Sequence, residues 1–149
     1  MHALNNAIGF ELLDAWAMSR ACDIFLEEMA HEGSHEDRAD HEVPGSGWYS
    51  EAVLATALRA AGNLFSLDVN DPINHRSENP SRILAPETLG VVVNKAGWHW
   101  FAYKNENGQI WRLDSLSQPT PLSYDEYLQD LALPDHRNAF ALVALPDVE

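Results

Sequence analysis

Hydrophobic residues recur at helical spacing in the first part of the chain. From Phe10 to Ala30 the sequence contains helix formers, no Pro or Gly, and apolar residues three to four positions apart, which predicts one helix, straight or bent. A second helix is predicted from Glu51 to Ala61, because Ser50 is a favourable N-cap residue and Gly62 is suited to end the last turn. The Pro and Gly residues between positions 44 and 47 separate the two helices.

The pattern changes after Gly62, where apolar and polar residues alternate and β-branched and aromatic residues become frequent. A short third helix is predicted from Tyr124 to Leu131, among the strands. Helices followed by an antiparallel sheet are typical of the α+β class, in which the sheet packs against the N-terminal helices. The predicted strands are Leu64–Val69, Gly90–Asn94, Trp98–Tyr103, Gln109–Leu113 and Ala139–Leu145.

The composition is that of a folded domain with an acidic surface. With 149 residues and 46% hydrophobic content, the chain is long enough to bury one core, so residues 1–149 are predicted to form one domain. Nine Lys and Arg residues against 23 Asp and Glu residues give a formal charge of −14, which argues against nucleic-acid and acidic-membrane partners. The same charge favours a basic protein partner, and a monomer is expected.

The single cysteine, Cys22, limits the chemistry that thiols can contribute. One cysteine forms neither an internal disulfide nor a thiolate metal cluster, and its place inside the first predicted helix favours a buried, unreactive side chain. No signal-like leader opens the sequence and no apolar run is long enough to span a bilayer, so a cytoplasmic or nuclear location is expected.

A predicted hairpin brings a histidine and a carboxylate together. If its link has four residues, 105–108, counting back along both strands places His99 directly opposite Asp114. If the turn is only Asn107 and Gly108, the two residues become diagonal neighbours but stay on one face, because side chains alternate with period two. A carboxylate beside an imidazole fixes its tautomer and orientation, as in the base and orienter of a nucleophilic relay. Spacing alone leaves a structural interpretation open, in which His99 packs between tryptophans and Asp114 starts a turn.

Motifs along most of the chain resemble those of the Josephin family of deubiquitinating cysteine proteases. The family opens its first helix with the pattern C-x-x-H-x-L-N-N, and HALNN at 2–6 matches the second half of it. Two further motifs resemble the strands that carry the family's catalytic histidine and its orienting Asn or Asp. These are HWF at 99–101 and LDS at 113–115. GWYS at 47–50 resembles the segment before the family's middle helix, and DPIN at 71–74 resembles the stretch before its histidine strand.

The resemblance implies a fold, a partner and roles for two residues. Josephin domains resemble papain-like proteases in fold and cleave ubiquitin conjugates, so a papain-like α+β fold and action on ubiquitin or polyubiquitin are expected. His99 would be the general base and Asp114 its orienter. Counting three residues back from His2 places the family's nucleophilic Cys two positions before Met1, with its oxyanion Gln further upstream. Either the chain is an N-terminally truncated product, which the cut motif favours, or it is a pseudo-enzyme that binds ubiquitin without cleaving it.

An acidic segment from Asp23 to Glu42, the acidic arm, carries eight acidic residues and one basic residue. Its position and charge resemble the family's movable lid, a helical arm that helps to hold ubiquitin, whose contact face is basic around an apolar patch. The resemblance therefore implies that the acidic arm contacts ubiquitin. A charge run is also typical of a solvated face, so binding through the arm is a hypothesis.

A zinc site is the weaker alternative. The segment HEGSH at 31–35 matches the zinc-protease pattern H-E-x-x-H, and His41 follows six residues later. On a helix the two histidines of the pattern would share a face, with Glu32 as the base. Arg38 stands where the extended pattern needs Gly, Gly33 weakens the helix, and no Met follows to form the Met-turn. No metal or cofactor is therefore assigned.

Overall fold

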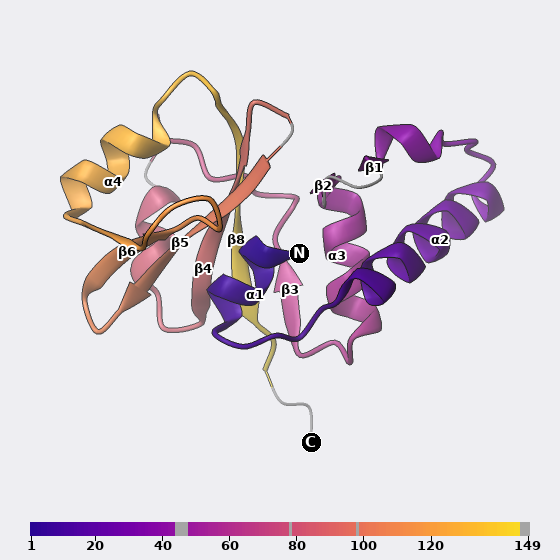
Figure 1. Ribbon diagram of the computed structural model, residues 1–149, viewed down its shortest axis with the longest axis horizontal. Helices are drawn as coiled ribbons and strands as arrows, with labels where there is room; N and C mark the ends of the chain where they lie inside the picture. Colours follow the sequence, from indigo (N-terminus) through magenta and orange to yellow (C-terminus); the bar gives the residue numbers. More distant parts are fainter. Residues whose placement is uncertain (44–47, 78, 98, 147–149) are drawn as a thin grey trace.

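The chain folds as an antiparallel sheet with helices packed on both of its faces, which confirms the α+β prediction (Figure 1). The computed structural model describes residues 1–43, 48–77, 79–97 and 99–146. Within these residues no helix is long and apolar enough to cross a membrane. The six-stranded sheet has the order β3, β8, β4, β5, β6, β7, and a separate small sheet pairs β1 with β2. The elements are α1 (His2–Ile8), α2 (Ala15–His31), η1 (Arg38–Asp40), β1 (Glu42–Val43), β2 (Trp48–Tyr49), α3 (Glu51–Ala60), β3 (Phe65–Leu67), η2 (Asn79–Leu84), β4 (Thr88–Lys95), β5 (His99–Glu106), β6 (Gln109–Leu113), β7 (Thr120–Leu122), α4 (Tyr124–Leu131) and β8 (His136–Ala144).

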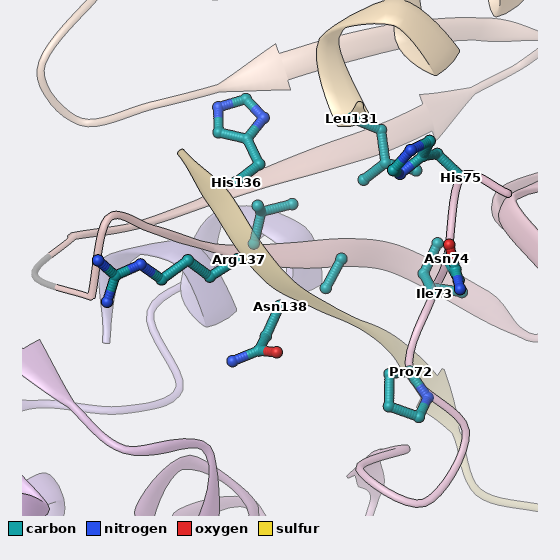
Figure 2. A pocket seen from close by; sticks show the side chains of 10 residues that line it. Pro72, Ile73, Asn74, His75, Leu131, His136, Arg137 and Asn138 are labelled. Carbon is teal, nitrogen blue, oxygen red and sulfur yellow. The ribbon is translucent and has the colours of Figure 1, made fainter. Parts of the chain in front are cut away.

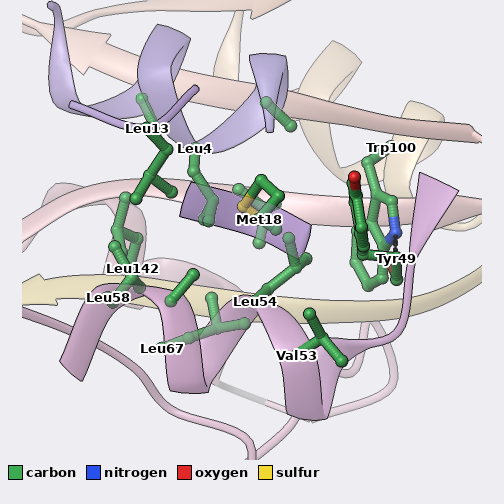
Figure 3. Packing of buried hydrophobic residues seen from close by; sticks show 14 of the residues in the cluster. Leu4, Leu13, Met18, Tyr49, Val53, Leu54, Leu58, Leu67, Trp100 and Leu142 are labelled. Atoms are coloured by element: carbon green, nitrogen blue, oxygen red, sulfur yellow. Dashed lines mark hydrogen bonds between the residues drawn. The ribbon is translucent and has the colours of Figure 1, made fainter. Parts of the chain in front are cut away.

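The large sheet separates two hydrophobic clusters, because neighbouring residues of a strand face opposite ways. In β5, Trp100 and Ala102 belong to the cluster formed with α1, α2 and α3. Phe101 and Tyr103 belong to the cluster formed with η2 and α4. Figure 3 shows the first cluster, to which the three helices contribute, among others, Leu4, Met18 and Leu54.

The helix predicted from Phe10 to Ala30 is wrong at its start. Residues 10–14 are not helical, and the preceding helix α1 ends before Gly9, whose φ of 100° is left-handed. The second helix begins after Asp14, whose carboxylate caps it by accepting a hydrogen bond from the Ala17 N–H at 2.7 Å. The five residues before Ala15 are therefore a loop despite their helical spacing.

One side chain holds the loop between α1 and α2. Asn5 Oδ1 accepts hydrogen bonds from the N–H groups of Leu12 and Leu13, both at 3.0 Å. Asn5 Nδ2 donates to the Leu13 carbonyl at 2.9 Å. These bonds satisfy backbone groups that a continuous helix would have paired internally, which stabilises the break.

The first helix lies directly on β4 and β5. A Cβ added at Gly90 would lie 2.9 Å from Ala7 Cβ and 2.7 Å from the carbonyl oxygen of Tyr103, so glycine permits the close approach. Lys104 donates from Nζ to the carbonyl of Ala7 and, at 3.3 Å, to that of Leu89. The lysine thereby satisfies a carbonyl at the end of α1, where the helix leaves its last oxygens unpaired.

The acidic arm contains the second half of α2, then η1 and β1, so it is helical as far as His31 and irregular for most of the rest. In Figure 1, α2 extends beside α3 and away from the large sheet. Arg38 binds the returning segment to α2, with Nη1 2.6 Å from Asp23 Oδ1 and Nε 2.8 Å from Glu42 Oε2. Glu28 forms an ion pair with Arg59 of α3.

A buried hydrogen bond ties the base of the arm to the large sheet. Nε1 of Trp100 donates to the carbonyl of Tyr49 at 2.7 Å, and both side chains are buried (Figure 3). Since Trp100 follows His99 in β5, the strand that begins with this histidine also anchors β2.

Some helices and strands have the predicted first and last residues, and others differ from the prediction. The helix α4 and the strand β6 have the predicted limits, and Ser50 caps α3 by accepting a hydrogen bond from the Val53 N–H at 3.3 Å. The strands β4 and β8 begin earlier than predicted, β5 ends later and β3 is shorter, while β1, β2 and β7 were not predicted. Residues 44–47 and Trp98, on which a predicted break and a predicted strand start fall, lie outside the described residues.

Candidate active site

The side chains of His99 and Asp114 are in contact on neighbouring strands. The hairpin pairs Glu106 with Gln109, so its turn is Asn107 and Gly108, and the four-residue link considered first is wrong. With the shorter turn the two residues are diagonal neighbours on one face, as the alternation requires. His99 Nε2 lies 2.8 Å from Asp114 Oδ1, which confirms the predicted geometry. The catalytic roles of the two residues stay a prediction.

The environment of Asp114 keeps its carboxylate charged. The side chains of His99 and Asp114 are 14% and 9% exposed, so the contact is shielded from water. Burial by itself raises the pKa of Asp114, but the Leu116 N–H at 3.0 Å, the hydrogen bond from His99 and the charges of His99 and Arg112 outweigh it. The pKa of this carboxyl group therefore lies below its ordinary value. An ionised Asp114 accepts the Nε2 proton of His99, and this contact fixes the tautomer and the orientation of the imidazole.

A polar group that the sequence did not predict lies on the same side of the sheet. Arg112 of β6 donates from Nη1 to Asp130 Oδ1 of α4 at 2.8 Å, and its Cζ lies 4.5 Å from the centre of the Phe101 ring. The other oxygen of Asp130 accepts a hydrogen bond from the Tyr103 hydroxyl. The alternation of β6 already places Arg112 on the face of Asp114, but its partner in α4 is a tertiary contact without a local signal.

The sequence was compared with models of known protein families. The Josephin family model matches residues 1–137, a span that includes His99 and Asp114. The chain belongs to the Josephin family. This Josephin domain is thus a member of a family of papain-like cysteine proteases with deubiquitinase activity. No curated protein matches the sequence at a significant level.

Cys22, the single cysteine of residues 1–149, is not placed for catalysis. Cys22 is fully buried in α2, within the cluster of α1, α2 and α3. Burial raises the pKa of its thiol, although the nearby charge of Arg38 acts in the opposite direction. A buried thiol with a raised pKa is a poor nucleophile, so the prediction of an unreactive Cys22 is consistent with its surroundings.

The zinc-protease pattern does not form the helix that it needs. The helix α2 ends at His31, and Gly33 has a φ of 84°, so His31 and His35 do not share a helix face. His41 instead packs into the base of the arm, with Nδ1 2.7 Å from Ser50 Oγ. Within the described part of the Josephin domain, no group of three His, Cys, Asp or Glu side chains could hold a metal ion.

A cavity of about 260 Å³ lies at the edge of β8. Figure 2 shows residues 72–75 on one side of it and β8 on the other. His75 is exposed here, while His136 is held by a 2.6 Å contact between Nδ1 and the Asp130 carbonyl. The lining residues include neither His99 nor Asp114, so the cavity is separate from the candidate pair.

Proposed function

We propose that this Josephin domain is the core of a ubiquitin-specific cysteine protease, with His99 as general base and Asp114 as its orienter. The observation that carries the proposal is the 2.8 Å contact between His99 Nε2 and Asp114 Oδ1 on neighbouring strands. A shielded histidine and carboxylate form the second half of a relay of nucleophile, base and orienter. Membership of the Josephin family makes a thiol the expected nucleophile and ubiquitin the expected substrate.

In the proposed reaction, Nδ1 of His99 removes the thiol proton and the thiolate attacks the carbonyl carbon of the isopeptide bond. The C–N bond breaks as the imidazolium returns the proton to the lysine amine, and water then hydrolyses the thioester. Asp114 remains ionised and stabilises the imidazolium, a role that its lowered pKa supports. Cys22 is buried, and the family's C-x-x-H spacing places the nucleophilic thiol two positions before Met1.

The acidic arm supports the choice of a basic partner. Asp23 and Glu42 are used internally by Arg38, whereas Glu27 and Glu32 are exposed along the arm. Exposed carboxylates steer a basic surface towards the protein and raise the association rate at low salt. We assign the contact with the basic face of ubiquitin to these exposed carboxylates.

One observation favours a second function, ubiquitin binding without cleavage. The single cysteine of residues 1–149 is buried and its thiol has a raised pKa, so these residues by themselves offer no reactive thiol. In that case His99 and Asp114 serve only to hold β5 and β6 together, and the arm carries the function.

The deciding experiment compares residues 1–149 with a chain extended by a segment that supplies Cys-x directly before Met1 and a Gln a few residues earlier. We expect the extended chain to cleave polyubiquitin and to react with thiol-reactive ubiquitin probes, and residues 1–149 to do neither. In the extended chain, His99→Ala should reduce the cleavage rate by about 10⁴-fold or more, because the relay loses its base. Asp114→Ala should cost less, since an orienter does not itself transfer the proton.

The matched control is His75→Ala, which removes an exposed histidine from the loop before η2 and should leave the rate unchanged. An extended chain that unfolds cooperatively yet stays inert on several ubiquitin linkages refutes the protease function. Binding of ubiquitin to residues 1–149, followed by NMR shifts of labelled ubiquitin, then tests the binding function alone. Absence of both cleavage and binding refutes both.

A further inference from the structure

We infer that Arg112 is a positioning residue for the pair of His99 and Asp114. The guanidinium, held by Asp130 and by the Phe101 ring, places a fixed positive charge on the face of the sheet that carries Asp114 and His99. The inference rests on the proposed function, because it assigns a role in tuning the same base.

Arg112 lies on the same face of β6 as Asp114. Arg112 and Asp114 are two residues apart, so their side chains leave the backbone on the same face of the sheet. Arg112 also pairs in register with Tyr103 of β5, one strand away and on the strand that begins with His99. The guanidinium thus lies on the face of the sheet that carries His99 and Asp114, on the side that α4 covers.

Two contacts hold the side chain of Arg112 in place. Its side chain is only 22% exposed and that of Asp130 16%, so the ion pair is shielded far more than a surface pair. One contact fixes Nη1 at 2.8 Å from Asp130 Oδ1, and the ring of Phe101 packs 4.5 Å from Cζ. An arginine held at two points keeps its charge at a fixed distance from Asp114, which a mobile surface lysine would not do.

The chemistry of the orienter explains why a fixed charge is useful here. The family uses Asn or Asp at this position, and an Asn accepts the imidazole N–H without carrying charge. An Asp in a shielded site is costly to ionise unless positive groups compensate for its burial. His99 and Arg112 are the charged groups that lower the pKa of Asp114. Together with the Leu116 N–H and the hydrogen bond from His99, the fixed charge of Arg112 helps an aspartate to do what an asparagine does elsewhere.

A purely structural role for the same contacts makes a different prediction. If Arg112 only fastens α4 to the sheet, then any loss of a bond to Asp130 should have the same effect. The Tyr103 hydroxyl also bonds Asp130, and its removal leaves the arginine charge in place. Tyr103→Phe is therefore the matched control for Arg112→Gln.

The first measurement is a carboxyl NMR titration of Asp114 in residues 1–149, which needs neither a nucleophile nor activity. The titratable groups that face this region are His99 and Tyr103 from β5, Asp130 from α4 and His136 from β8. We expect Arg112→Gln to raise the midpoint of Asp114 by about 0.5–1 pH unit, and Tyr103→Phe to leave it in place. If Arg112→Gln does not fold, Arg112→Met, which keeps an unbranched stem against Phe101, provides the same test.

The second measurement is a double-substitution cycle on kcat/KM in the extended chain. With Asp114 present, Arg112→Gln should lower kcat/KM by about fivefold, and in the Asp114→Asn background by less than about twofold, because the charge to be stabilised is gone. An equal loss in both backgrounds, an unmoved Asp114 midpoint, or an equal shift in Tyr103→Phe overturns the inference. An inert extended chain refutes the protease function while the NMR titration still decides the role of Arg112.

Discussion

Replacing Gly90 with alanine would add a methyl group where α1 lies closest to the sheet. The new Cβ would lie 2.7 Å from the carbonyl oxygen of Tyr103 and 2.9 Å from Ala7 Cβ. The first contact is with backbone, so no side-chain rotation relieves it. Either β4 and β5 separate locally or α1 moves outward, and both changes disturb the end of α1 that Lys104 holds.

The expected cost follows from these two contacts. Overpacking a filled site costs about 1–3 kcal/mol, and the contact with a backbone oxygen places this site in the upper half of that range. The lower chain entropy of alanine in the unfolded state offsets about 0.4–1 kcal/mol. We therefore expect Gly90→Ala to lower the free energy of unfolding by about 1–2.5 kcal/mol.

Urea unfolding followed by tryptophan fluorescence measures this change as a lower midpoint with an unchanged slope. Ala7→Gly alone should cost about 1–2 kcal/mol through helix propensity and a lost buried methyl group. Because it removes one of the two close contacts, the double variant should be more stable than the sum of the single costs by about 1 kcal/mol. A Gly90→Ala variant within about 0.5 kcal/mol of the parent, or strict additivity with Ala7→Gly, would refute the packing argument.

Two further predictions concern the base of the arm and the residue beside Asp130. Trp100→Phe removes the N–H donor to the Tyr49 carbonyl and leaves that buried oxygen unpaired, so it should cost about 1–2 kcal/mol and speed hydrogen exchange in β2. Burial lowers the pKa of His136 below its ordinary 6.5, more than its contact with the Asp130 carbonyl raises it. The unfolded chain therefore takes up this proton first, and the contribution of His136 to stability is complete above about pH 6.5 and is lost as the pH falls through the folded pKa. Urea midpoints measured from about pH 7.5 to about pH 5 should fall less in His136→Gln than in the parent, and parallel curves would contradict the assignment.

Local signals explain which elements could be predicted from the sequence. The helix α4 begins at a capping box between Ser123 and Glu126, and its bounds follow from neighbouring residues alone. The hairpin has a comparable signal, because Asn107 and Gly108 adopt φ values of 54° and 89°, which suit Asn-Gly in a two-residue turn. Either turn length kept the two candidate site residues on one face, so their contact was predictable before the register was known.

Tertiary contacts explain what the sequence could not show. The loop before α2 depends on Asn5, whose side chain accepts hydrogen bonds from the N–H groups of Leu12 and Leu13. The spacing of apolar residues does not reveal such a hydrogen bond. The link from Arg112 to Asp130 joins residues that are 18 positions apart and belong to different elements. The very short strands β1 and β2 depend on pairing with each other and offer no run of strand-forming residues.

The alternation of side chains along β5 gives the domain two sides that can diverge separately. Trp100 packs with the helices that carry the arm, while Phe101 and Tyr103 pack with α4. Substitutions without shared partners add in free energy, so a change on one side need not be compensated on the other. Over evolution, the surface residues of the arm can therefore change while the contacts around Asp130 stay the same. Related chains should accordingly show independent patterns of variation on the two faces, with the backbone of β5 common to both.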